Sequence, residues 1–393
     1  MRRVGLIIPT LKKTCFYAIL AALALTAAPL PVLAVEPEDA ELDLSFFERY
    51  WQEIEKEAGE ILPPVNWRNF WESLRSGETL INPGRLFSGA GRYFFGELLL
   101  QLKIMGQLLV LAVAAAFLKN IESAFQREQV ATLTRSIVLI VLIGISVQVF
   151  HAAITSAARV INDMVDFALA LLPTIIVLLA SLGSFVSSAM LHPLVVFGIN
   201  FFGSLIRAVI LPLIYLSTVL GLANHFSPSF QVGKLADLFR DLCGWGLGLT
   251  MTLFVGILTV QGAAGTVADA VSLRTAKYMT GAFVPVVGKM LSDAVETVMG
   301  ASLLLKNGIY LGGIVVLFLL ALFPLLKLAA VILVYKVSAA LVQPLGDTGL
   351  AEGINTMAGC LTMVLATMAS VTLIFILAVT VVVGAGNAAL MYR

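Results

Sequence analysis

The sequence predicts an all-α membrane protein, a bundle of about seven transmembrane helices, or eight if residues 279–302 also cross. Of its 393 residues 59% are hydrophobic and only 12% are charged, whereas a soluble domain usually carries about 25% charged residues. Seven apolar runs are also long enough to cross a bilayer core of roughly 30 Å, which needs about 20 residues. These runs are 97–118, 136–158, 167–190, 196–222, 243–263, 308–335 and 361–386.

Residues 1–34 read as a secretory signal peptide. A basic start, an apolar core from Cys15 to Ala28 and small residues at Val32 and Ala34 are the pattern that signal peptidase recognises. An uncleaved first transmembrane helix is the alternative, and it stays open at this point. In either case the following segment begins outside the cytoplasm.

Residues 35–96 form an acidic extracytoplasmic segment. Apolar side chains at helical spacing predict a short amphipathic helix over 44–58 and a second one near 67–74. Two interpretations stay open for this segment. The helices lie on the membrane surface, with tryptophans at the interface, or they form a docking surface for a partner protein.

The remaining chain, 97–393, is the predicted polytopic domain. The basic residues of loops 119–135 and 264–307 favour placing both loops in the cytoplasm. Residues 279–302 are apolar but charged, and whether they span, re-enter or lie flat stays open. The side of the C-terminus depends on that answer.

Charged residues inside apolar runs are the candidate functional residues, because each costs roughly 2.5–3.5 kcal/mol to insert. They are Arg207, Lys289, Asp293, Glu296 and Lys327. The spacing of Lys289, Asp293 and Glu296 puts them on one helix face. We expect Lys289 to pair with Asp293, and Glu296 to find a partner such as Arg207 or Lys327. Structural ion pairs and residues lining a pathway are both compatible with this pattern.

Two prolines, Pro173 and Pro285, are candidate helix breaks. Each follows an apolar span and an alanine-rich amphipathic turn, about 112 residues apart in the sequence. If this echo is a true duplication, an odd number of crossings between the copies would make it an inverted repeat, as in many transporters.

No nucleotide-binding, metalloprotease or paired-cysteine motif occurs in the sequence. We therefore expect no catalytic residues, no cofactor, no metal site and no nucleic-acid partner, and we expect the protein not to be an enzyme. The net charge is only +1, which gives no general attraction for nucleic acid. Any energy source would come from a partner or an ion gradient.

Residues 273–307, LRTAKYMTGAFVPVVGKMLSDAVETVMGASLLLKN, resemble the most characteristic segment of the stage III sporulation protein AE family. The resemblance covers the chain from about residue 40 and includes the order of signal peptide, acidic segment and membrane domain. It implies a multi-pass protein of the mother-cell membrane that surrounds the forespore. The family brings no catalytic residues to carry over.

The resemblance also implies partners, namely the other stage III sporulation AA–AH proteins and a forespore-membrane protein. The AA–AH proteins include ring-forming subunits and a secretion-type ATPase. The expected function is that of a channel or secretion-like subunit between mother cell and forespore, needed for late forespore gene expression and forespore maintenance. A stand-alone secondary transporter with a midplane charged site and a non-conducting scaffold are the alternatives. Contact with the lipid bilayer is expected, and self-association into a homo-oligomer is compatible with the sequence.

Overall fold

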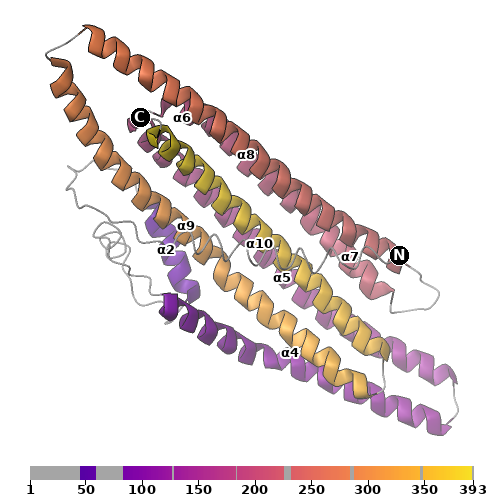
Figure 1. The fold of residues 1–393 in the computed structure, drawn as a ribbon. Coiled ribbons are helices and arrows are strands. Elements are labelled where there is room, and N and C mark those ends of the chain that lie inside the picture. Colours follow the sequence, from indigo (N-terminus) through magenta and orange to yellow (C-terminus); the bar gives the residue numbers. More distant parts are fainter. Residues whose placement is uncertain are drawn as a thin grey trace.

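The computed structural model describes seven stretches of the chain, and all are built almost wholly of helix (Figure 1). They are residues 45–58, 83–125, 128–182, 184–224, 232–283, 287–345 and 348–391. No strand occurs within these stretches, so the predicted all-α class is confirmed. The predicted signal peptide, 1–34, and the predicted helix near 67–74 lie outside the described residues.

Helices are expected here because apolar backbone in lipid must satisfy its own hydrogen bonds, and a helix does so within one segment. The elements are α2 (Ser45–Ala58), α4 (Pro83–Phe125), α5 (Glu128–Ser181), α6 (Phe185–Leu205), the π-helix η3 (Ile206–Ile210), α7 (Leu211–Ala223), α8 (Gly233–Phe283), α9 (Val287–Val342), the 3-10 turn η4 (Gln343–Leu345) and α10 (Thr348–Met391).

The long helices run in two opposite directions along one bundle axis (Figure 1). Helices α4 and α9 are parallel, because residue numbers rise together along their contact. The Tyr93 ring meets Phe323 edge-on, and four residues further along both helices Glu97 lies beside Lys327. Helix α10 runs against α9 and packs closely on it. Helix α8 is parallel to α10. The continuous rod α6–η3–α7 is antiparallel to both.

The helices are arranged with α4 along one edge of the bundle and α8 along the other (Figure 1). Helix α4 packs on α9 and α5, whereas α8 packs on α10, α6 and α7. Helices α9 and α10 lie between these edges, and α5 packs against both of them. The core therefore sits where α5, α9 and α10 meet, with Leu171, Val316 and Leu361 fully buried.

Within the described residues, six helices are long and apolar enough to cross a membrane, one fewer than the sequence predicted. The predicted spans 136–158 and 167–190 are the source of the difference, because helix α5 runs unbroken through most of both. The charged residues between them, from Arg159 to Asp166, lie on this continuous helix. A helix accommodates these side chains on its surface without losing backbone hydrogen bonds, so the backbone continues.

Residues 279–302 do not form a separate helix. Helix α8 continues to Phe283 and α9 begins at Val287, so these residues make the end of one long helix and the start of the next. Figure 1 shows this α8–α9 hairpin reaching past the other helices at one end of the bundle. Pro285 belongs to 284–286, between the two helices and outside the described residues.

Pro173 does not end a helix, contrary to the expectation, and lies inside α5. A proline removes one backbone donor, but membrane helices tolerate it when neighbouring helices pack around the site. The surrounding residues Leu171, Leu172 and Ile175 are all buried in the core. Packing on both sides of Pro173 therefore holds the helix together.

The direction of the helices changes two further expectations. The turns after α4 and after α8 lie at opposite ends of the bundle (Figure 1), so loops 119–135 and 264–307 do not share one side. Helices α5 and α8 run in the same direction, because each runs against the rod α6–α7 between them. A duplication relating these two helices would thus be parallel and not inverted.

Helix α2 confirms the predicted amphipathic helix over 44–58 and shows what its apolar face contacts. Phe47, Trp51 and Ile54 are buried on α9 and α5. The rings of Phe46, Phe47 and Tyr50 surround Phe167 of α5, with centroid distances of 5.9, 5.5 and 5.2 Å. The protein's own bundle therefore covers this apolar face.

The polar edge of α2 lies near acidic residues of α5. Burial raises the pKa of the Tyr50 phenol, and the carboxylates of Asp166 and Asp163 raise that pKa further. Both effects favour the neutral phenol, so Tyr50 stays uncharged where α2 meets α5. Helix α2 thus rests on the flank of the bundle, well inside the length of α5.

Candidate functional site

Arg207 lies in the only π-helix of the described residues, η3, between α6 and α7. The N–H of Leu211 donates to the carbonyl of Ile206, five residues back. Pro212 follows directly and has no N–H, so it cannot donate to the carbonyl of Ala208. The wider π-turn accommodates this missing bond, and such turns occur frequently at functional sites.

The Arg207 guanidinium joins α6 to α5. Its Nε donates to the carbonyl of Gly203 at 3.1 Å, and a terminal nitrogen donates to the side-chain oxygen of Asn162. Helices α5 and α6 approach closely here, since a Cβ at Gly203 would lie 2.8 Å from Val165 Cγ2. These two contacts use two of the five N–H donors of the side chain, which leaves donors for a further acceptor.

Replacing Arg207 by Met or Asn162 by Leu should each lower the free energy of unfolding by about 1–3 kcal/mol, because each leaves a polar partner unsatisfied. The double variant should cost less than the sum, with a coupling of about 1 kcal/mol. Unfolding of the purified protein in mixed micelles measures this. Asn200→Leu is the matched control, since exposed Asn200 bonds to the carbonyl of Val196 on its own helix. Additive single effects would contradict the Arg207–Asn162 bridge.

Lys327 pairs with Glu97 of α4, a residue that the sequence analysis missed. Lys327 Nζ lies 3.9 Å from Glu97 Oε1, and Gln101 donates to the same oxygen at 2.7 Å. The Glu97 side chain is 8% exposed and that of Lys327 is 57% exposed. The available signal was an acidic residue at the start of the apolar run 97–118.

The expected pairing of Glu296 with Lys327 is wrong. Both residues lie on the continuous helix α9, 31 positions apart, which is about 46 Å at 1.5 Å per residue. Arg207 bonds to Asn162 instead. The five candidate charges are therefore spread along the bundle and do not form one site.

Lys289, Asp293 and Glu296 lie in the first turns of α9. Their backbone is helical, as their spacing predicted, while their side chains lie outside the described part of the structure. The predicted Lys289–Asp293 pair stays a prediction. These residues belong to the α8–α9 hairpin at one end of the bundle.

Asp269 is a fully buried carboxylate that the sequence analysis also missed. It lies on α8 and accepts hydrogen bonds from the backbone N–H of Val186 at 2.8 Å and of Ser187 at 3.1 and 3.3 Å. Ser184, at the usual capping position of α6, makes no side-chain cap. Asp269 therefore supplies from another helix the acceptor that the start of α6 needs.

Lys306 is the third buried charge that was missed, after Glu97 and Asp269. It had been placed in a loop, but it lies in α9 and is fully buried. Its Nζ lies 3.4 Å from the carbonyl oxygen of Val383 on α10. Tyr310 and Thr380 make a further polar contact between these helices, at 3.4 Å.

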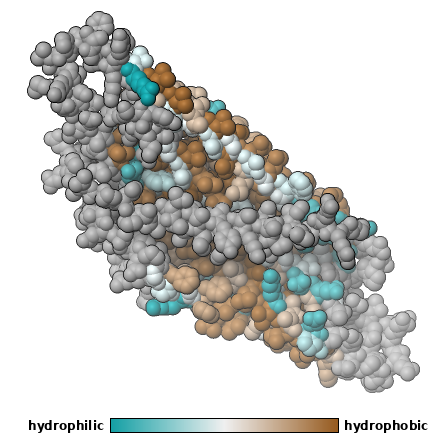
Figure 2. All heavy atoms as spheres, viewed as in Figure 1, coloured by the Kyte–Doolittle hydropathy of each residue, from teal (hydrophilic) through white to brown (hydrophobic). Residues whose placement is uncertain are grey.

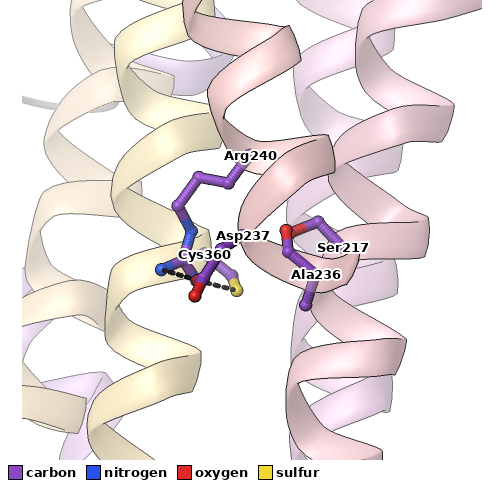
Figure 3. Close-up of polar contacts among 5 residues, drawn as sticks. All are labelled: Ser217, Ala236, Asp237, Arg240 and Cys360. Atoms are coloured by element: carbon purple, nitrogen blue, oxygen red, sulfur yellow. Dashed lines mark hydrogen bonds and ion pairs between the residues drawn. The ribbon is translucent and has the colours of Figure 1, made fainter. Parts of the chain in front are cut away.

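Helices α8 and α10 are joined by Arg240 (Figure 3). Its guanidinium contacts Cys360 Sγ at 3.5 Å and lies 3.8 Å from Asp237 Oδ1. Nearby, the Ser217 hydroxyl donates to the carbonyl of Ala236 at 2.8 Å and joins α7 to α8. Within the described residues, no three His, Cys, Asp or Glu side chains gather in a way that could hold a metal ion.

Comparisons with known proteins agree with one family over most of the chain. The family model described as stage III sporulation protein AE (spore_III_AE) matches residues 65–386. The stage III sporulation protein AE of Bacillus subtilis (strain 168) is 36% identical over 354 residues, which are 90% of this chain and 88% of that protein. No solved structure matches the chain.

Proposed function

Because this chain belongs to the stage III sporulation protein AE family, we propose that it is the membrane subunit of a channel or secretion-like complex between mother cell and forespore. Its place would be the mother-cell membrane around the forespore, with the other AA–AH proteins and a forespore-membrane protein as partners. The observation that carries this proposal is family membership over 65–386 together with the six long apolar helices found among the described residues. The protein is a sporulation-related membrane protein, and energy for transport would come from a partner ATPase.

The distribution of charge favours a subunit of a complex over a self-sufficient transporter. A transporter site at the membrane midplane would need several polar groups around one solute. Here Arg207 bonds to Asn162, and Lys327 pairs with Glu97. Two hollows in the described surface meet at Gln261, and neither is lined by Arg207 or Lys327.

Deleting the gene in its spore-forming host should stop late forespore gene expression after engulfment and make the forespore shrink. A fluorescent reporter under a late forespore promoter and measured forespore volume test this, with the intact gene restored as control. Normal reporter activity and normal forespore volume in the deletion strain would refute the proposal.

Charge variants at the start of α9 distinguish the channel hypothesis from the scaffold hypothesis. If the complex conducts, Lys289→Ala and Glu296→Ala should block forespore development while partner proteins still co-purify. The scaffold alternative predicts normal development in both variants, but loss of partner recruitment when residues 36–96 are removed. Normal sporulation with both charge variants would therefore count against a conducting role for these residues.

A further inference from the structure

The exposed apolar surface of the bundle is longer than a bilayer is thick. On α8 alone, exposed large apolar side chains recur from Leu235 to Val271, about 54 Å at 1.5 Å per residue. A tilt of about 40° would shorten this projection only to about 41 Å, against a hydrocarbon core of roughly 30 Å. Figure 2 shows apolar residues (brown) along the visible helices, with hydrophilic ones (teal) among them. Lipid chains cannot cover all of this surface, so part of it is available to a protein partner.

The two edge helices are the least covered. Inside the protein, 17% of the α4 span and 22% of the α8 span are buried, against 61% of the spans on α9 and α10. The two edges lie on opposite sides of the bundle (Figure 1). If copies of the chain contact each other through these edges, α4 of one copy meets α8 of the next, which is a head-to-tail contact.

The two edges carry opposite charges among exposed apolar residues. On α4, Lys103 is exposed beside Leu99 and Leu102, which are 67% and 40% exposed. On α8, Asp237 and Asp241 are exposed close to Trp245, which is 80% exposed.

Within the described part of the chain, these charges have no close ion-pair partner. Lys103 and Asp241 have no ion-pair partner among the described residues, and Asp237 has only a 3.8 Å contact with Arg240 of its own helix (Figure 3). A charge in an apolar span usually faces a partner or water. Lys234 is also exposed, and Arg240 reaches inward to Cys360 of α10, so this part of α8 is neutral overall and Asp237 and Asp241 are its exposed carboxylates.

The charges on the two edges also lie at matching levels along the bundle axis. Glu97 of α4 lies beside Lys327 of α9. Since Tyr310 meets Thr380 on the antiparallel α10, Lys327 lies at about the level of residue 363. Helix α8 runs with α10 and places Arg240 at Cys360, so the level of Glu97 on α8 is at about residue 243.

Lys103 lies six residues beyond Glu97, which brings it to about the level of Asp237, with Asp241 about one helical turn away. Copies related by rotation about an axis parallel to the helices keep these levels. Helix α4 of one copy and α8 of the next would then run antiparallel, with opposite charges facing each other.

We propose that copies of this chain assemble side by side in the membrane, with α4 of one copy packed on α8 of the next and Lys103 paired with Asp237 and Asp241. The contact covers the two edges that the described residues leave open and pairs the exposed charges of one edge with those of the other. It is independent of what the assembly conducts, so a failure of this inference would leave the proposed function standing.

Disulfide cross-linking of full-length protein in membranes tests the contact. In a chain with Cys15, Cys243 and Cys360 changed to Ser, Lys103→Cys and Asp241→Cys are placed on separate, differently tagged copies. We expect a cross-linked dimer only when both copies are present together. Cross-linking by either variant alone would indicate a symmetric contact and overturn the proposal, as would the absence of any cross-link in the mixture.

Charge reversal gives a readout that does not depend on cysteines. Lys103→Glu, and separately Asp237→Lys with Asp241→Lys, should each reduce co-purification of two tagged copies about tenfold. Combining both changes in one chain should restore association, whereas Glu352→Lys, an exposed acid on α10, should have no effect.

Two outcomes of the charge-reversal experiment would refute the inference. One is association that is unaffected by reversal. The other is a monomer that loses bound anionic lipid when Lys103 is reversed, because the partner of Lys103 would then be a lipid headgroup.

Discussion

Gly265→Val should prevent stable folding of the bundle. A Cβ at Gly265 would lie 2.7 Å from Ser187 Oγ and 3.0 Å from Ser187 Cα. The Cα belongs to the backbone of α6 and cannot rotate away, so α6 and α8 would have to separate. Overpacking of this kind costs about 1–3 kcal/mol, and more where backbone must move.

The separation would also break the cap on α6. Asp269 lies one turn after Gly265 on α8 and accepts from the N–H groups of Val186 and Ser187. Any movement that admits a valine would lengthen these bonds and leave a fully buried carboxylate poorly satisfied. An uncompensated buried charge typically costs about 3–5 kcal/mol. The two effects together should exceed what a single core substitution usually does.

The measurement is the amount of protein in the membrane and its unfolding temperature in mild detergent. Gly256→Val on the same helix is the matched control, because nothing lies within 4 Å of a Cβ at Gly256. Both variants carry the same intrinsic cost of valine in a helix, so the difference between them reports the contact with Ser187. Equal stability of the two variants would show that α6 and α8 are not packed as described.

The sequence was sufficient for the helical class, for α2 and for most of the membrane-spanning regions. Apolar runs of about 20 residues have few other folds available in lipid, and amphipathic spacing is a local signal. The sequence wrongly predicted two separate spans on either side of residue 160, where α5 is continuous. Charged side chains there mark polar surroundings, but they do not reveal whether the backbone turns, because a helix and a loop both satisfy them.

The polar contacts could not be predicted, because their partners are far apart in the sequence. Glu97 and Lys327 come from the first and fifth membrane helices, and Asp269 reaches residues more than 80 positions earlier. Hydropathy identified Lys327 as unusual and gave no information about its partner. Asp269 and Lys306 were missed because they lie near the ends of apolar runs, where charges are commonly solvated.

Phe47→Ala should release α2 from the flank of the bundle. Phe47 is fully buried, and its ring meets Phe167 edge-on at 5.5 Å. Truncating a buried phenylalanine costs about 3–5 kcal/mol. Helix α2 has only 14 residues, and a helix of this length is marginal without tertiary packing. Losing the anchor should therefore both detach α2 and unfold it.

Hydrogen exchange of the amides in 45–58 measures this release, and protection should fall about 100-fold or more. Glu48→Ala, an exposed neighbour on α2, should leave protection unchanged. Phe167→Ala should produce a similar loss from the other side of the contact, and the double variant should add little, because both substitutions remove the same interaction. Unchanged protection in Phe47→Ala would mean that α2 is held by something other than this aromatic cluster, and additive losses would mean that the two rings act separately.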